Sequence, residues 1–363
     1  MTGRLTVTDG TGESSTIKAD TEIDQLRFPL PTSAADAAEI TYAAEFTFAD
    51  GTRASYPAAG GTMSAVAISR ATTVDLGTAG FSHDQQDPGD LVVSGDWGTG
   101  PDEFGIDPQL SGPSSFDVDP RTGDIVVLDQ VNARIVRVSP DGTSRPHPID
   151  LHPGLPDLAV APDGSLDVLY VNAVSGASLQ QFSANGGTAL REIELATPSA
   201  NAIRRVGDTV FVEADDSYWV PVTRGTDTLS VDEQVASATS GVTDGDHLVI
   251  RKHLLDQGNE VRVADSADGS VRAWRLTGTT LLGAVPVAAP LPDGDVVVVQ
   301  SQYDDDHAQY SILTLGDGET RVTVAPHARY ADLYDPSEFR LDGDDLYQLR
   351  STVSGFAIYR YRL

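Results

Sequence analysis

The feature that most constrains this chain is a repeated order of short β-strand patterns separated by Asp-Gly or Gly-Asp turns. The clearest copy lies at 114–150, where apolar runs alternate with turns such as Pro140–Gly142. Further copies follow with a period of roughly 40 to 50 residues, a length that suits four strands per copy. The repeat predicts an all-β fold, a β-propeller in which each copy forms one four-stranded blade.

The end of the sequence indicates how such a ring would close. Six copies can be aligned, and the sixth stops at Leu363 before its outer strand. Thr72–Gly77 has the pattern of an outer strand and precedes the first complete copy. We therefore expect this N-terminal strand to complete the C-terminal blade, because closure removes exposed sheet edges. The sequence predicts a six-bladed propeller over residues 71–363.

Residues 1–70 lie outside the repeat. We expect them to form a small β-rich appendage, and an extra blade, making seven, is the alternative. A long connection, Phe81–Pro113, precedes the first complete copy and carries Trp97. The strand patterns of the appendage are Leu26–Pro29, Ile40–Phe48 and Ala54–Tyr56.

Acidic residues dominate the charge of the chain. Asp and Glu number 54 against 24 Lys and Arg, which gives a net charge of −30. This excess repels a phosphate backbone at long range, so nucleic acid and anionic membranes are not expected partners. A protein, or a small neutral or cationic ligand, is the expected partner. The chain has no cysteine, which excludes disulfides, thiolate metal sites and cysteine nucleophiles.

The sequence contains no apolar run of about 18 residues, so no transmembrane segment is expected. Its polar start shows no signal peptide in this chain. The acidity, the two lysines and the lack of cysteine favour an extracytoplasmic protein, secreted or anchored at a surface. We expect a monomer.

The first complete copy and the segment before it resemble the NHL repeat. The matching elements are a Gly-Pro-Asp-Glu-Phe sequence at Gly100–Phe104, an Asn-x-Arg-Ile sequence at Asn132–Ile135 and the turn at Pro140–Gly142. The second copy matches in part, and the others match only in the order of their strand patterns. NHL domains form six-bladed propellers, so the resemblance implies the same number of blades. We interpret Asp129 and Arg134 of this copy as a pair that holds its hairpin together.

Oxygen-bearing side chains recur just before the expected inner strands. Ser115, Asp157 and Glu338 occupy one position when the copies are aligned, and Asn201 lies near the equivalent place. In a propeller, this position lies at the mouth of the central channel. Carboxylates suit calcium, so Asp157 and Glu338 are candidate metal ligands and calcium is the candidate cofactor.

Three histidines offer a second metal hypothesis. His83, His152 and His327 each follow an outer-strand pattern, and three histidines on one face could bind zinc. Isolated surface histidines explain the same pattern.

We interpret the chain as a non-catalytic module that binds a protein or ligand at the channel mouth, with Trp97 and Trp219 at the rim. The first alternative is a metal-dependent lyase or lactonase that uses calcium or zinc at the channel. The second is a structural domain of a cell-surface assembly. The sequence has no Gly-x-Ser-x-Gly elbow, phosphate-binding loop or dinucleotide fingerprint.

Overall fold

The computed structural model describes most of the chain. Among the described residues, those in β-strands far outnumber those in helices. The described residues are 2–8, 12–22, 25–28, 39–48, 50–56, 63–66, 71–81, 88–108, 111–151, 155–172, 176–197, 200–214, 218–239, 241–244, 247–253, 258–265, 270–316, 320–328, 330 and 338–363. Within them, no helix is long and apolar enough to cross a membrane.

The chain divides into two compact units. The first comprises Met1–Val74, Asp246–Leu248 and Glu260–Leu276. The second comprises Asp75–Gly245, Val249–Asn259 and Thr277–Leu363.

The N-terminal strands of the first unit form a sheet of their own. Its strand order is β2-β1-β5-β6, and β7 also pairs with β5, so the order is not the consecutive one of a simple meander. Apolar and polar residues alternate along β1, which buries Leu5 and Val7 on one face and exposes Arg4 on the other. The bounds are β1 Thr2–Thr8, β2 Ser14–Lys18, β5 Glu39–Thr47, β6 Arg53–Tyr56 and β7 Met63–Val66, and a separate hairpin joins β3 Asp20–Glu22 to β4 Gln25–Arg27.

Three successive four-stranded antiparallel meanders follow in the second unit, as the repeat predicts. The first contains β10 Ser115–Val118, β11 Ile125–Asp129, β12 Arg134–Val138 and β13 Ser144–Pro148. The second contains β14 Leu155–Val160, β15 Leu166–Asn172, β16 Gly176–Ser183 and β17 Gly186–Glu194. The third contains β18 Ala200–Val206, β19 Thr209–Ala214, β20 Tyr218–Arg224 and β21 Asp227–Thr228, and the short helix α2 Val231–Ala236 follows it.

Three further sheets follow among the described strands. One has the order β22-β23-β24-β25-β8, with β22 Val242–Asp244, β23 His247–His253, β24 Asn259–Asp265, β25 Val271–Thr277 and β8 Thr72–Asp75. The next has the order β26-β28-β29-β30, with β27 also paired to β28; its bounds are β26 Leu281–Leu282, β27 Val287–Pro290, β28 Val296–Tyr303, β29 Ala308–Leu315 and β30 Arg321–Pro326. The last has the order β31-β32-β33-β9, with β31 Phe339–Asp342, β32 Asp345–Thr352, β33 Gly355–Arg362 and β9 Asp90–Asp96.

An N-terminal strand completes the C-terminal sheet, but the prediction chose the wrong one. The strand is β9, which pairs with β33, whereas the predicted Thr72–Gly77 segment supplies β8, which pairs with β25. Burial explains the difference. Val93 of β9 lies opposite Ile358, and both are buried in one apolar cluster, whereas β8 is mostly exposed. The prediction that Thr72–Gly77 supplies an outer strand is confirmed, because β8 is the last strand in the order of its sheet.

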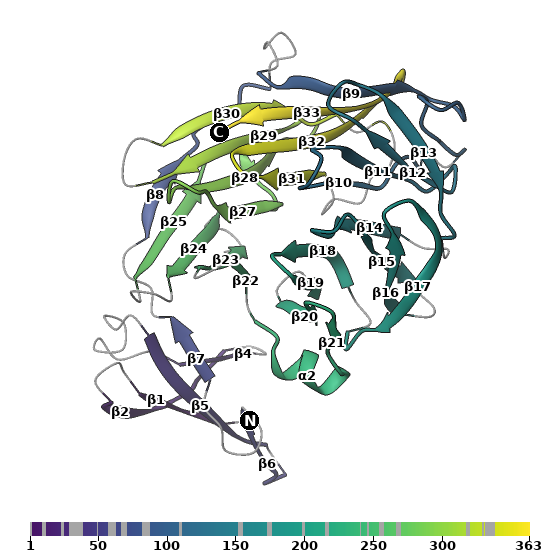
Figure 1. The fold of residues 1–363 in the computed structure, drawn as a ribbon. Helices are drawn as coiled ribbons and strands as arrows, with labels where there is room; N and C mark the ends of the chain where they lie inside the picture. Colours follow the sequence, from purple (N-terminus) through teal and green to yellow (C-terminus); the bar gives the residue numbers. More distant parts are fainter. Residues whose placement is uncertain are drawn as a thin grey trace. The chain divides into compact units, whose positions relative to one another are not determined.

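Apolar side chains fill the spaces between successive sheets of the second unit. Strand β10 lies beside β14 and β31, and β14 lies beside β18 (Figure 1). Phe116 and Val127 of the first meander pack with Leu349 and Phe356 of the C-terminal sheet. The opposite face of β11 packs against the second meander through Leu128. Because both faces of these sheets are covered, every residue of β11 is buried. The inner strands β10, β14, β18 and β31 lie close together.

Candidate functional site

The motif residues that resemble an NHL repeat form a structural network. Arg134 donates from Nε to Asp129 Oδ2 at 2.8 Å, and the Gly105 amide donates to Asp129 Oδ1 at 3.0 Å. Asn132 donates to the same carboxylate, and Arg134 also donates to the Glu103 carbonyl. Asp129 is fully buried. The interpretation of Asp129 and Arg134 as a structural pair is confirmed, and the pair also fixes the segment that enters the first meander.

The inner strands bring two of the predicted site residues together. The Ser115 hydroxyl at the start of β10 donates to Asp157 Oδ1 of β14 at 2.6 Å. Arg340 of β31 donates to the same Oδ1 at 2.6 Å and to Ser115 Oγ at 3.2 Å. The Ile203 amide of β18 donates to Asp157 Oδ2 at 2.8 Å. Four strands from four sheets therefore meet at one carboxylate, which is 1% exposed.

Two further charged side chains, Asp117 and Arg204, lie half-buried on these inner strands. The Asp117 carboxylate of β10 accepts hydrogen bonds from the Val160 and Val118 amides at 2.7 and 2.9 Å. Burial raises its pKa, and Asp157 adds to that effect against the opposing charge of Arg340. Arg204 of β18 donates to the Pro286 carbonyl at 3.1 Å. These two side chains are desolvated and still partly accessible, which is the usual condition of groups that contact a ligand.

The other predicted residues lie elsewhere. Glu338 accepts from the Tyr310 hydroxyl at 2.6 Å and from Gln348 Nε2 at 2.9 Å. Asn201 lies at a β-bulge between Ala200 and Ala202, which explains why it aligned one residue off.

The two tryptophans do not form a common rim. Trp97 forms an isolated bridge with Phe104 and donates to the Thr352 carbonyl at 2.9 Å. Trp219 is 3% exposed, and Arg251 lies over its ring at 5.8 Å. A side chain this deeply buried cannot offer its ring to a partner at the surface.

The proposed calcium ligands do not fit a calcium ion. Both oxygens of Asp157 accept hydrogen bonds, and the Arg340 guanidinium occupies the place where a cation would bind. Both oxygens of Glu338 are also engaged. Among the described residues, no group of three His, Cys, Asp or Glu side chains is arranged to hold a metal ion. Of the three predicted zinc ligands, His83 and His152 lie outside the described residues, and His327 packs against the Tyr310 ring at 5.4 Å.

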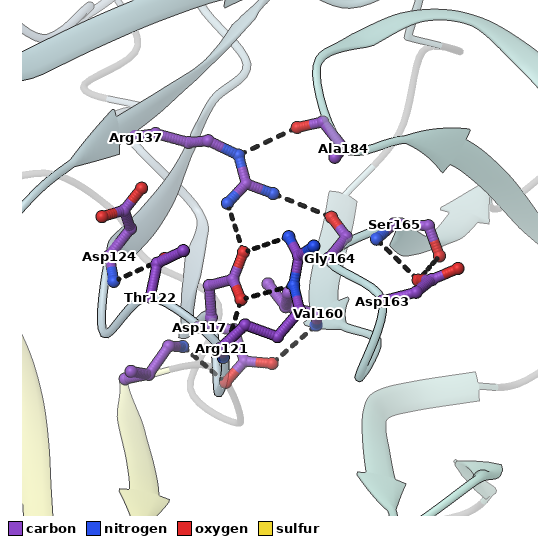
Figure 2. Close-up of polar contacts among 12 residues, drawn as sticks. Asp117, Arg121, Thr122, Asp124, Arg137, Val160, Asp163, Gly164, Ser165 and Ala184 are labelled. Atoms are coloured by element: carbon purple, nitrogen blue, oxygen red, sulfur yellow. Dashed lines mark hydrogen bonds and ion pairs between the residues drawn. The ribbon is translucent and has the colours of Figure 1, made fainter.

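A second polar network joins the first two meanders (Figure 2). Asp119, directly after β10, is fully buried and accepts from Arg137 Nη1 of β12 at 2.7 Å. The same guanidinium donates to the Gly164 and Ala184 carbonyls of the second meander, each at 2.8 Å. Arg121 donates to Asp119 from the turn. Because every contact is within the protein, we interpret this network as a structural clamp between two sheets.

Asp117→Asn and Asp119→Asn are expected to change stability with opposite dependence on pH. Burial opposes ionisation of Asp119, but hydrogen bonds from Arg121 and Arg137 outweigh it, so its pKa lies below 3.8. Its stabilising effect is therefore complete above the unfolded pKa and is lost as the pH falls through the folded pKa. Asp117 has a raised pKa, so the unfolded chain releases this proton first and stability falls as the pH rises through that window.

Urea unfolding of both variants between about pH 3 and pH 7 measures this contrast. The loss of stability caused by Asp119→Asn should grow with pH, and the loss caused by Asp117→Asn should shrink. Parallel pH profiles for the two variants would contradict the charge environments described above.

Sequence reasoning missed Asp117, Arg204 and Arg340, although a signal for them was present. Side chains two residues apart on a strand point to the same face of the sheet. Asp117 is therefore expected on the same face as Ser115, and Arg340 on the same face as Glu338. Arg204 holds the corresponding place on β18, two residues after Ala202, which is beyond the bulge. Comparing the positions two residues further along each aligned strand would have found all three.

A surface hollow of ≈ 580 Å³ lies on the polar face of the N-terminal sheet. Its lining includes Arg4, Lys18, Glu45 and Arg53, and none of the predicted site residues. Arg4 lies directly between Lys18 and Glu45 in the sheet. All four side chains are exposed, so water and salt screen their charges. We therefore locate the candidate site at the inner strands of the second unit.

Comparisons with known proteins give structural likenesses only. No protein-family model and no curated protein matches the sequence. Hydrazine synthase of Kuenenia stuttgartiensis is 16% identical, with a TM-score of 0.44 over 67% of this chain and 74% of that chain. Virginiamycin B lyase from Staphylococcus aureus is 10% identical, with a TM-score of 0.42 over 71% of this chain and 97% of that chain. The WD40 β-propeller domain of Doa1 is 12% identical, with a TM-score of 0.37 over 76% and 97% of the two chains.

These TM-scores are too low to carry an argument. The propeller interpretation therefore depends on the observed order of the strands, and membership of the NHL family stays a prediction.

Proposed function

We propose that the chain is an NHL-like, six-bladed β-propeller that binds a ligand at the inner strands of its second unit and catalyses no reaction. The successive antiparallel meanders support the blade interpretation, and the pairing of β9 with β33 supports closure of the ring. The composition supports a location outside the cytoplasm, where an acidic chain without cysteine is at no disadvantage.

The observation that carries this proposal is the charged cluster on the inner strands. Burying an ion pair such as Asp157–Arg340 costs desolvation free energy, which apolar side chains would avoid. Buried pairs also hold the structure together at Asp129–Arg134 and Asp119–Arg137, so the accessible neighbours of Asp157–Arg340 distinguish this cluster from them. The half-buried Asp117 and Arg204 lie beside this pair and keep part of their surface accessible. A polar, partly accessible cluster of this kind favours binding over simple support.

The described carboxylates of the cluster give no support for catalysis. Asp157 is held by Arg340, Ser115 and two backbone amides, and Asp117 by two backbone amides. A general base needs a lone pair directed at a substrate proton. These carboxylates instead direct their oxygens at donors of the protein.

Backbone amide resonances provide a direct test. Butyrate, butyramide and butylammonium have similar shapes and different charges, and each would be titrated into ¹⁵N-labelled protein. At least one should shift the amide resonances of Leu158, Val160 and Ile203, which donate to the central carboxylates. The amide of Thr143, bonded to Asp141 in an exposed turn, is the matched control and should not move. If no probe shifts the three central amides, the binding proposal fails and the structural alternative replaces it.

A further inference from the structure

Three arginines approach one another at the inner strands. Arg204 of β18 and Arg251 of β23 both donate to the Pro286 carbonyl, at 3.1 and 3.2 Å. Arg251 is also paired with Glu213 at 2.5 Å, and Arg340 is paired with Asp157. Among the described residues, no carboxylate lies within ion-pair distance of Arg204, and its one hydrogen bond is to a neutral carbonyl. The Glu213 and Asp157 carboxylates act on Arg204 only from beyond ion-pair distance, because they pair directly with Arg251 and Arg340.

The surroundings of Arg204 make its positive charge costly. Burial lowers its pKa to about 10, and repulsion from Arg340 and Arg251 contributes to the same shift against the opposing charges of Glu213 and Asp157. A guanidinium normally holds its proton far above that range. An anion placed against Arg204 would relieve the repulsion and recover part of the desolvation free energy. The side chain is only half-buried, so such an anion has access to it.

We propose that the ligand of the inner-strand site carries a carboxylate group and that Arg204 binds this group. This inference rests on the proposed function, since it names the chemistry of the same site. The remaining N–H groups of Arg204 form a planar fork that matches the two oxygens of a carboxylate. The net charge of −30 favours a cationic or neutral ligand for the chain as a whole. The guanidinium of Arg204, which forms no close ion pair with a described carboxylate, favours an anionic group at this one position.

The test compares butyrate with butyramide, using the central amide shifts of wild-type protein and of Arg204→Met. Butyrate should bind the wild type at least tenfold more tightly than butyramide does, because a charge-assisted pair replaces a neutral one. Arg204→Met should abolish this preference. Arg145→Met is the matched control: Arg145 is an exposed arginine paired with Asp124 in the first meander, and its loss should leave the preference unchanged.

Melting temperatures separate a binding role of Arg204 from a structural one. Without ligand, Arg204→Met should melt at or above the wild-type temperature, because it removes the repulsion and because Arg251 still donates to the Pro286 carbonyl. A lower melting temperature would identify Arg204 as a structural residue and overturn the inference. Central shifts with butyramide or butylammonium but not with butyrate would also overturn it, while leaving the binding function intact. Shifts with no probe would remove both.

Discussion

Asp157→Asn is expected to lower the free energy of unfolding by about 3–5 kcal/mol, because it leaves a buried charge without its partner. The Asp157 carboxylate is 1% exposed and accepts from Arg340, Ser115, Leu158 and Ile203. Asparagine retains one acceptor oxygen and turns an NH₂ group toward donors. The Arg340 guanidinium would then lie in the interior facing other donors. Urea unfolding of the two proteins measures the difference.

Asp163→Asn is the matched control for this change. Asp163 lies in the same meander as Asp157, in the exposed turn between β14 and β15. In the described contacts, it accepts hydrogen bonds only from Ser165. It should cost about 1 kcal/mol or less. The double variant Asp157→Leu with Arg340→Met should recover much of the stability that Asp157→Asn loses, since apolar pairs replace buried ion pairs at little cost. Equal losses for Asp157→Asn and Asp163→Asn would contradict the central position of Asp157.

The order of the strands could be predicted from the sequence because it depends on local patterns. Each meander alternates short apolar runs with Gly and Asp turns, and Gly123 and Gly142 adopt the positive φ angles that such turns require. The strand that completes the C-terminal sheet could not be chosen in this way. Both β8 and β9 have β-strand patterns, and the choice depends on the burial of Val93 against Ile358, residues far apart in the sequence.

The site was predictable only where a repeated position carried it. Aligning the copies found Ser115 and Asp157, which are in direct contact. Arg340 lies 183 residues from its partner Asp157, and no repeat relates an arginine to an aspartate in another sheet. The same alignment placed Glu338 with them, but its side chain binds Tyr310 of the preceding sheet. Equivalent backbone positions thus did not guarantee that the side chains meet.

Gly95→Val is expected to destabilise the protein by about 3 kcal/mol, because β9 has no room for a side chain at this position. A Cβ atom on Gly95 would lie 2.8 Å from Phe104 Cδ2 and would overlap the Asp102 carbonyl oxygen. Phe104 packs on Phe356 of β33 with ring centroids 4.4 Å apart, so the strain would reach the pairing of β9 with β33. Urea unfolding measures the loss, and faster hydrogen exchange in β33 would locate it.

Gly80→Val is the control for Gly95→Val, since a Cβ atom at Gly80 meets nothing within 4 Å and its φ angle is not positive. This variant should change stability by about 0.5 kcal/mol or less. The comparison tests the closure of the ring, because β9 supplies the only N-terminal segment that pairs with β33 in the described sheets. If Gly95→Val behaves like Gly80→Val and leaves exchange in β33 unchanged, β9 does not close the C-terminal blade. The proposed six-bladed ring would then lack its closing strand.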